Sequence, residues 1–423
     1  MPSNLRRLLG VGLCCCLLGW HAGGCTTSQP PPAANPGGEG IPCSAPGPAL
    51  TEPPRLLSAE ELSAGWIALF DGQTLFGWQP QSQANWRVEN GAIVVDGGPP
   101  GLLCTTTEFS DYVLQFDCRT APGTNSGVFL HTPLDPRDPA RDCYEVNIAE
   151  EDNPYPTGSL VERAKAEGRY ATQDWLPIEV TVQGGQVAVH ISGRKVVDYR
   201  DPAPLRRGHI GLQRNQGRAE FRHIKLRPLG LAELFQGKSL AGWKTRPDMP
   251  GQFTVTQEGW LEVKNGPGQL ESEASYGDFV LQLECITHAP NLNSGVFFRC
   301  IPGEQMNGYE SQIHNGFKNG DRTSPADCGT GGIFRRQNAR LVIPDDGQWF
   351  HKTIVAHGPH VAVWVNGCQV SDWTDTRRPD KNPRKGRRDE PGTVMIQAHD
   401  QTTHLSFRNL RAAELPPRSS NPR

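Results

Sequence analysis

The chain has 423 residues, a length that allows two or three domains. Its formal net charge is -3 and its one long basic run is 377–388, which argues against nucleic acid as the main partner. With 36% apolar residues, 47 glycines and 37 prolines, the composition favours turn-rich β structure over a helical bundle.

The first elements along the chain are targeting signals. A basic start, a short apolar run (8–20) and small residues before Cys25 predict a signal peptide over 1–24. The pattern resembles the lipobox of bacterial lipoproteins, in which such a cysteine is lipidated, although Ala22 stands where leucine is usual. Residues 25–57, rich in Pro, Gly and Ala, predict a flexible tether. We therefore expect an exported protein held at the membrane by lipid on Cys25, periplasmic or at the cell surface, with plain secretion as the alternative.

Export would place the fold in an oxidising compartment, where cysteines can pair. Sequence alone does not give the pairing among the eight that remain, which are Cys43, Cys104, Cys118, Cys143, Cys285, Cys300, Cys328 and Cys368. Cys118 and Cys285 each continue an alternating apolar strand face. We predict that both are buried core residues and not nucleophiles.

The strongest organisational signal is an internal repeat. Residues 68–78 return as 233–243, 112–118 as 279–285 and 125–129 as 293–297. The spacing between matched positions grows along the chain while the motifs persist, as insertions in loops between preserved strands would produce. We predict two copies of one domain, over 58–229 and 231–415, followed by a short tail at 416–423.

Each copy is predicted to be all-β. Residues 187–196 and 361–370 alternate apolar and polar side chains and then turn at Ser-Gly or Asn-Gly, which indicates hairpins. Helix candidates are short: 59–64, capped by Ser58, and 159–168. Many short strands at this spacing favour a β-sandwich or jelly roll.

Two stretches of the second copy carry the candidate site. If 293–299 is a strand, then Asn293, Gly295, Phe297 and Arg299 share one face. If 309–314 is a neighbouring strand, Glu310, Gln312 and His314 share a face, and Gln397 and His399 share a face of a third strand. Such a gathering of groups that are costly to bury predicts a site, with a solvated outer face as the alternative.

These motifs carry a family resemblance. A Leu-Phe-Asp-Gly opening that ends in Gly-Trp, the Asn-Ser-Gly-Val-Phe motif, Gly-Tyr-Glu at 308–310 and Phe-Arg-Asn-Leu at 407–410 resemble the 3-keto-disaccharide hydrolase domain family. Both copies match, the second more fully. The resemblance implies two concanavalin-like jelly rolls whose concave sheet handles sugar. It also implies cleavage of glycosides oxidised at the 3-position, so the expected partner is an oxidised di- or oligosaccharide.

The chemistry of such a substrate suggests roles for these residues. A ketone at C3 acidifies the proton at C2, so a base can start elimination of the group at C1. We expect His314 or Glu310 to be that base and Arg299 to face the developing oxyanion, with His399 as a second acid or base. In the substrate-binding role we place Asn293, Gln312, Gln397 and Trp364. A divalent cation on Glu310 with His314 or His399 is a further option, although no ligand spacing is specific for it.

The first copy departs from this pattern. It has His131, Asn147, Ala149 and Asn215 where the second has Arg299, Gln312, His314 and His399, but it keeps Asn125 and Glu145. We therefore expect the first copy to be a binding or supporting half, with His131 as a base only from a different position. For the whole chain, the alternatives to an enzyme are a carbohydrate-binding module without turnover and a cell-surface scaffold.

Overall fold

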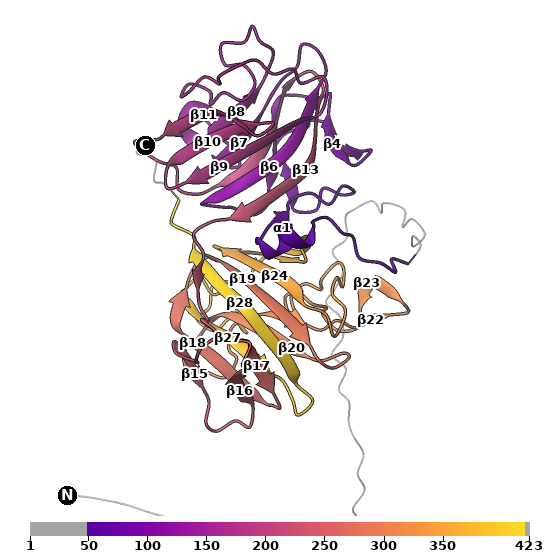
Figure 1. Cartoon of the computed structure of the whole chain (residues 1–423), viewed down its shortest axis with the longest axis vertical. Helices are drawn as coiled ribbons and strands as arrows, with labels where there is room; N and C mark the ends of the chain where they lie inside the picture. The colour runs from indigo at the N-terminus through magenta and orange to yellow at the C-terminus, as the bar shows by residue number, and fades with distance from the viewer. Residues whose placement is uncertain (1–48, 419–423) are drawn as a thin grey trace, which may run out of the picture. The chain divides into compact units, whose positions relative to one another are not determined.

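Nearly every element in residues 49–418, the part of the chain that the computed structural model describes, is an antiparallel β-strand (Figure 1). The two helices in this part are short, α1 (Ala59–Ser63) and α2 (Pro139–Asp142), and neither is long enough to cross a membrane. The predicted signal peptide, Cys25, Cys43 and most of the predicted tether lie outside the described residues.

The first domain is a sandwich of two sheets. The eight-stranded sheet has the order β11-β10-β9-β6-β13-β4-β3 with β1 paired to β13, and its strands are β1 (Ile67–Ala68), β3 (Arg87–Glu89), β4 (Ala92–Val95), β6 (Tyr112–Thr120), β9 (Leu176–Gln183), β10 (Gln186–Ile191), β11 (Arg194–Arg200) and β13 (Ala219–Pro228). The five-stranded sheet has the order β2-β5-β12-β7-β8, with β2 (Trp78–Pro80), β5 (Gly101–Thr105), β7 (Asn125–Thr132), β8 (Tyr144–Ile148) and β12 (His209–Gln216).

The second domain repeats this order strand for strand. Its eight-stranded sheet runs β16-β17-β28-β19-β24-β25-β26 with β14 on β28, from β14 (Ala232–Glu233), β16 (Gln252–Val255), β17 (Leu261–Lys264), β19 (Phe279–Thr287), β24 (Phe350–His357), β25 (His360–Val365), β26 (Cys368–Thr374) and β28 (His404–Glu414). Its five-stranded sheet runs β15-β18-β27-β20-β21, from β15 (Trp243–Thr245), β18 (Gly268–Tyr276), β20 (Ser294–Cys300), β21 (Tyr309–Ile313) and β27 (Gly392–Ala398). A separate hairpin joins β22 (Phe317–Lys318) to β23 (Asp321–Pro325).

Alternation along the strands builds the two cores. In β6, Leu114, Phe116 and Cys118 are buried against the facing sheet, while Gln115 and Asp117 point away from it. The same alternation in β19 buries Cys285 in the second core. Burial of such apolar faces contributes roughly 25 cal/mol per Å². The prediction of two tandem all-β jelly-roll domains is confirmed, and Cys118 and Cys285 are core residues as predicted.

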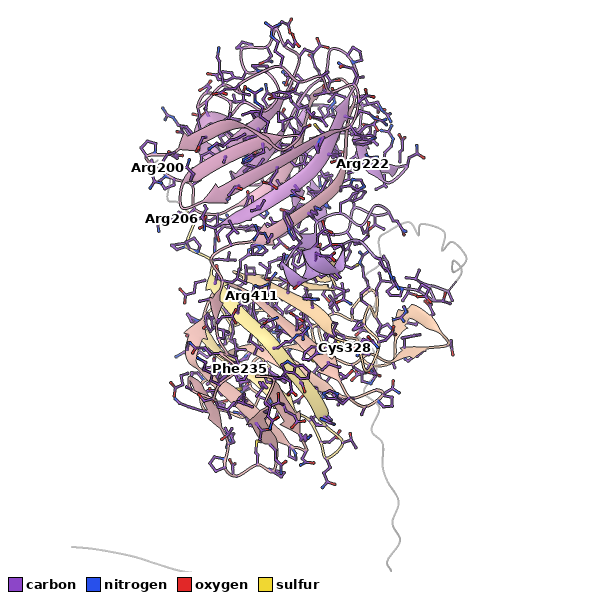
Figure 2. The ribbon with its side chains drawn as sticks, viewed as in Figure 1. Arg200, Arg206, Arg222, Phe235, Cys328 and Arg411 are labelled. Carbon is purple, nitrogen blue, oxygen red and sulfur yellow. The ribbon has the colours of Figure 1, made fainter. Side chains whose placement is uncertain are left out.

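None of the cysteines in the described part is paired. Cys104, Cys118, Cys143, Cys285, Cys300, Cys328 and Cys368 are free and buried (Cys328 is labelled in Figure 2). Desolvation raises the pKa of the Cys118 thiol to about 12, so it is protonated at neutral pH.

One helix prediction is confirmed and the other is wrong. Helix α1 begins at a capping box, in which Ser58 Oγ accepts from the Glu61 amide at 3.2 Å and Glu61 accepts from the Ser58 amide at 2.8 Å. Residues 159–168 form turns and bridges, because their main chain bonds to the edge of β8: the Val161 amide donates to the Glu145 carbonyl at 3.0 Å. An open strand edge outcompetes the weak local helix propensity of this segment.

Candidate functional site

A cavity of about 450 Å³ lies on the outer face of the five-stranded sheet of the second domain. The inward side chains of β20 and β21, such as Val296 and Ile313, belong to the core, so their alternate neighbours face outward into this hollow. Its lining includes Phe297, Met306, Glu310, Arg335, Arg384 and Gln397.

Glu310 occupies the floor of the cavity because its neighbour across the sheet is a glycine. Glu310 pairs with Phe297, and Gly295 pairs with Gln312, so the Glu310 side chain leans diagonally over Gly295. A Cβ added to Gly295 would lie 2.4 Å from Glu310 Oε1, closer than any real contact. The glycine of the Asn-Ser-Gly motif therefore provides the space that the carboxylate occupies.

The electrostatic environment of Glu310 suits proton transfer. Burial raises the pKa of its carboxyl to about 7, and Asp327 raises it further, while Lys352, Arg335 and Arg384 oppose the rise. Among residues 49–418, its carboxylate has no hydrogen-bond or ion-pair partner. A carboxyl group that is about half ionised near neutral pH, and is not engaged by the protein, can accept a proton from a ligand or return it.

Two amide side chains on the same face have unused acceptors. Gln397 Nε2 contacts Met306 Sδ at 3.2 Å, and Gln397 Oε1 is buried without a partner among the described residues. Gln312 Nε2 donates to Asp327 Oδ2 at 3.0 Å, and its Oε1 is likewise unpaired in the described part. Asn293 Nδ2 reaches the same Asp327 oxygen at 3.5 Å. Buried acceptors of this kind are normally satisfied, and because Gln397 lines the cavity whereas Gln312 and Asn293 do not, a ligand hydroxyl is a fitting partner for Gln397 Oε1.

Arginines form a positive rim above Glu310, and sequence reasoning missed them. Arg384 donates to the Met306 carbonyl at 3.0 Å, which ties the basic run 377–388 to the cavity wall. Arg335 arrives from a loop that follows the edge of β21, where the Phe334 amide donates to the Glu310 carbonyl at 2.9 Å. The basic run was the one visible signal, and its usual interpretation is a solvated loop.

The structure separates the two predicted histidines from this cavity. His314 lies beyond the end of β21, four residues or roughly 13 Å along the strand from Glu310, and its Nδ1 accepts from the Gly316 amide at 3.2 Å. His399 lies beyond β27, where its side chain is 41% exposed and pairs with Asp400 at 2.8 Å. Neither residue lines the cavity with Glu310, so the expected convergence of both imidazoles on it is wrong.

Arg299 does not face the site, and this expectation is also wrong. The pairing of β20 with β27 shifts between Phe297 and Cys300, and Arg299 has a φ of +48°, so a bulge turns its side chain away. The guanidinium is 2% exposed, bonds to Asp278 at 2.9 Å and donates to the carbonyls of Gly277 and Gly358. It is a structural cation.

The same bulge occurs in the first copy. His131 matches Arg299 and has a φ of +52°. Both of its ring nitrogens contact main-chain carbonyls, those of Leu205 at 2.9 Å and Ser110 at 2.7 Å. Desolvation lowers the pKa of His131, and the ring is buried, so it supplies no base to either sheet face.

Trp364 is a packing residue and not the exposed stacking platform that a sugar would need. Its side chain is 1% exposed, and its Nε1 donates to the Ala68 carbonyl at 2.9 Å. It contacts the first core as well as its own sheet, which accounts for an aromatic residue at an otherwise alternating hairpin position.

The first copy keeps part of the site in a more apolar setting. Gly127, Glu145 and Gln213 match Gly295, Glu310 and Gln397, and Gly127 pairs directly with Gln213. Burial raises the pKa of Glu145 to about 7 as well, while Gln213 lowers it. The neighbouring positions are occupied by the apolar cluster Leu102, Cys104, Phe129 and Cys143. The repeated unit is therefore glycine, glutamate and glutamine, without the arginine rim.

The option of a metal on Glu310 and a histidine has no geometric support in residues 49–418. No group of three or more His, Cys, Asp or Glu side chains in that part could hold an ion. The acceptors around Glu310 are a single carboxylate and amides, which suit hydroxyl groups.

Comparison with known proteins identifies the family. Residues 65–227 and 230–413 each match the model of the 3-keto-alpha-glucoside-1,2-lyase-like domain. Over 77 residues the chain is 30% identical to a 3-keto-disaccharide hydrolase of Bacteroides thetaiotaomicron, an alignment that covers 15% of this chain and 27% of that protein. The chain thus spans about a quarter of that relative's length.

Two solved structures each align with less than half of this chain. A protein of Parabacteroides distasonis, named as a glycosyl hydrolase, aligns with 42% of this chain and 99% of its own at 20% identity, with a TM-score of 0.38. The carbohydrate-binding module CBM66 of Bacillus subtilis aligns with 36% of this chain and 95% of its own at 14% identity, with a TM-score of 0.30. Because the family model matches both domains and most of the described chain, the protein belongs to the 3-keto-alpha-glucoside-1,2-lyase-like domain family and carries two tandem copies of that domain.

Proposed function

We propose that the second domain cleaves the glycosidic bond of 3-keto-glucosides, with Glu310 as the group that moves the proton. The observation that carries this proposal is the state of Glu310: mostly buried, unpartnered among the described residues and with a pKa of about 7. Family membership supports a carbohydrate-cleaving enzyme, and the name of the curated relative supports the oxidised substrate.

The reaction balances without a cofactor. Glu310 takes the proton from C2, and the electron pair of that C–H bond moves towards the C3 carbonyl, whose oxygen becomes an enolate. When the enolate returns its electrons, the C1–O bond breaks and a C1=C2 double bond forms. The departing alkoxide takes the proton from the Glu310 carboxyl and leaves as an alcohol. Addition of water across C1=C2 then gives the free 3-keto sugar, so the net reaction is hydrolysis.

The other cavity residues supply binding and charge. Arg335 and Arg384 lie close enough to lower the pKa of Glu310, and they are placed to stabilise a developing enolate oxygen. The unpaired Gln397 Oε1 accepts from a sugar hydroxyl. This assignment gives the electrostatic role first expected of Arg299 to the two rim arginines. We also propose, from the N-terminal sequence, that the enzyme acts outside the cytoplasm as an exported lipoprotein.

Release of nitrophenol from p-nitrophenyl 3-keto-α-glucoside by the purified full-length chain tests the proposal. Because Glu310 must be ionised to take the C2 proton, kcat/KM should rise with pH through an inflection near 7. Glu310→Gln should lower kcat about 10²–10⁴-fold.

The matched control is Glu145→Gln in the first domain, which should keep wild-type turnover because no arginine rim surrounds that carboxyl. Equal activity of wild type and Glu310→Gln would refute Glu310 as the proton carrier. Saturable binding of the keto sugar with no product at any pH would show a binding module and refute the enzyme.

A further inference from the structure

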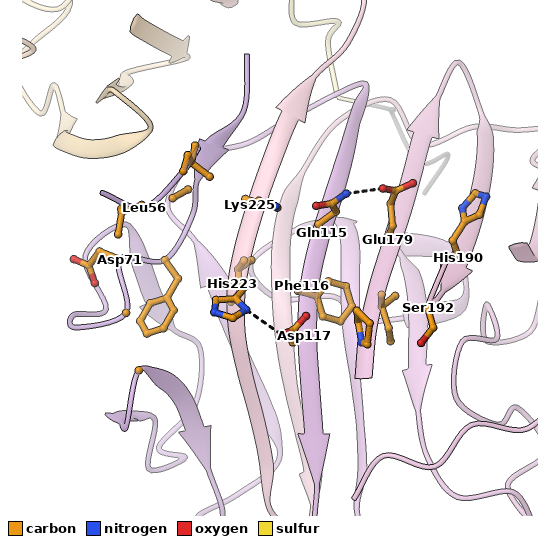
Figure 3. A pocket seen from close by; sticks show the side chains of 18 of the residues that line it. Leu56, Asp71, Gln115, Phe116, Asp117, Glu179, His190, Ser192, His223 and Lys225 are labelled. Carbon is orange, nitrogen blue, oxygen red and sulfur yellow. Dashed lines mark hydrogen bonds and ion pairs between the residues drawn. The ribbon is translucent and has the colours of Figure 1, made fainter. Parts of the chain in front are cut away.

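A second and larger cavity, of about 750 Å³, lies on the other sheet of the first domain (Figure 3). Its floor is the outer face of β13, β6, β9 and β10, and its walls come from residues 55–57 and 70–72. The volume is within the range of pockets that enclose small organic ligands. It shares no residue with the cavity around Glu310, so the proposed reaction leaves it unexplained.

The floor of this groove consists of polar side chains held in place by one another. Gln115 Nε2 donates to Glu179 Oε2 at 2.6 Å, and Asp117 Oδ2 accepts from His223 Nδ1 at 2.9 Å, as the dashed lines in Figure 3 show. His190 stands on the next strand beside Glu179, its partner across the pairing of β10 with β9. Each fixed pair keeps lone pairs or N–H groups that a ligand can use.

Three of the charged side chains that line the groove are paired within the protein, and the Glu179 carboxylate accepts from the neutral amide of Gln115. Asp117 accepts from Arg222 Nε at 3.1 Å, Lys225 pairs with Glu61, and Asp71 pairs with Arg340 at 2.9 Å. A charged ligand would have to compete with these pairs. A neutral ligand that both donates and accepts hydrogen bonds would not.

One polar atom at the groove lacks any partner. His190 Nδ1 is buried and makes no hydrogen bond within residues 49–418. Leaving a buried imidazole nitrogen without a partner is unfavourable, and a ligand hydroxyl that reached it would remove this cost.

In the second domain, main-chain groups from residues 65–68 already cover the sheet face that corresponds to this groove. There Gln282 and Trp364 take the positions of Gln115 and His190, as the strand pairings show. Gln282 Nε2 donates to the Gly65 carbonyl at 2.8 Å, and Trp364 Nε1 donates to the Ala68 carbonyl. A cavity of only about 10 Å³ remains beside Gln282. The face thus presents donors to the oxygens of an occupant, and in the first domain it is open.

We propose that the groove of the first domain binds a neutral oligosaccharide. Gln115 and His190 donate to or accept from sugar hydroxyls, and Glu179 and Asp117 accept from hydroxyl groups. Leu56, on the wall, supplies apolar contact for the C–H face of a sugar ring. Binding here would keep a chain of sugars close to the second domain by raising its effective concentration. The assignment does not depend on the proposed reaction.

Isothermal titration calorimetry of the full-length chain with maltotriose and with cellotriose, at millimolar concentration, tests this assignment. We expect saturable binding of at least one trisaccharide and a Kd raised about tenfold or more by Gln115→Ala and by Glu179→Ala, as expected when ligand hydrogen bonds are lost. Lys318→Ala, an exposed change on β22 of the second domain that does not line the groove, should leave the Kd unchanged. Circular dichroism checks that each variant is folded, and His190→Ala provides a third groove variant.

Three results would overturn the assignment. The first is that neither sugar binds, and the second is that all three groove variants bind the sugar as tightly as the wild type. The third is that the chain forms a dimer that Gln115→Ala dissociates, which would show that a protein segment occupies the groove. Turnover is measured on a 3-keto glucoside and binding on unoxidised sugars. Failure of one proposal is therefore distinguishable from failure of the other.

Discussion

Lys352 is a cation inside the second sandwich, and its replacement by isoleucine tests the link between the core and the candidate site. Its side chain is 1% exposed, and its Nζ donates to the carbonyls of Ser311 and Gln312 at 2.9 Å each, on the strand that carries Glu310. The first copy has Ile178 at this position, since Ile178 pairs with Phe116 as Lys352 pairs with Leu283. The fold therefore accommodates an apolar residue here.

The size of the effect follows from the pKa of Lys352. Burial lowers it from 10.5 to about 7. Between these two pH values the unfolded chain binds a proton that the folded protein lacks, so wild-type stability should rise with pH across this window. At 1.36 kcal/mol for each pH unit, the destabilisation by Lys352 is about 5 kcal/mol below pH 7 and vanishes above pH 10.5.

Lys352→Ile should remove this pH dependence. Below pH 7 the variant should be the more stable protein, by about 5 kcal/mol less roughly 1–2 kcal/mol for the lost hydrogen bonds. The difference should decline towards pH 10. The variant should also shift the pH profile of turnover to higher pH, because the ammonium of Lys352 lowers the pKa of Glu310.

Urea denaturation at pH values from 6 to 10 measures the difference in unfolding free energy between the wild type and Lys352→Ile. The contributions of all other titrating groups are the same in both proteins and cancel in this difference. Lys318→Ile is the control for the loss of an exposed lysine. Parallel stability curves for wild type and Lys352→Ile would refute the burial argument.

Two further predictions concern the strand β20. Gly295→Ala should lower kcat/KM about 10–100-fold, because the added Cβ would lie 2.4 Å from Glu310 Oε1 and would displace the carboxylate. Gly127→Ala in the first domain is the control and should not affect turnover. Equal kinetics for the two variants would contradict the geometry. Arg299→Met should cost about 1–3 kcal/mol of unfolding free energy, measured in urea, because the carbonyls of Gly277 and Gly358 lose their donor while Asp278 keeps its pair with Arg207. A loss of turnover in a variant of wild-type stability would instead point to a direct role.

Local patterns in the sequence account for the successful predictions. The hairpins at 187–196 and 361–370 appear as β10–β11 and β25–β26, because alternation and a Ser-Gly or Asn-Gly turn act within a few residues. The same rule gave Glu310 a face shared with Gln312 and gave Gln397 a face of a third strand, and the structure brings Glu310 and Gln397 into one cavity. The predicted helix at 159–168 failed because the edge of β8 offers its main chain better partners.

The remaining errors share a cause in long-range register. Strict alternation predicted that Arg299 shares a face with Glu310. The pairing of β20 with β27 instead contains a bulge between Phe297 and Cys300, which turns Arg299 away. Trp364 was expected to bind substrate, but it is buried, and its Nε1 donates to the carbonyl of Ala68, which lies far away in the chain. Arg335 and Arg384 reach the cavity on loops whose path depends on the edge of β21 and on the Met306 carbonyl.

The amino-acid sequence alone determined the duplication, the all-β architecture, the family resemblance and the strand face that Glu310 shares with Gln312, because repeats and period-two alternation are local properties of the chain. Only the tertiary structure decided which charged groups surround that carboxylate and which sheet faces stay open. Those outcomes depend on cross-strand pairing, on bulges and on loops that bond to distant strand edges, and a single sequence does not specify such partners.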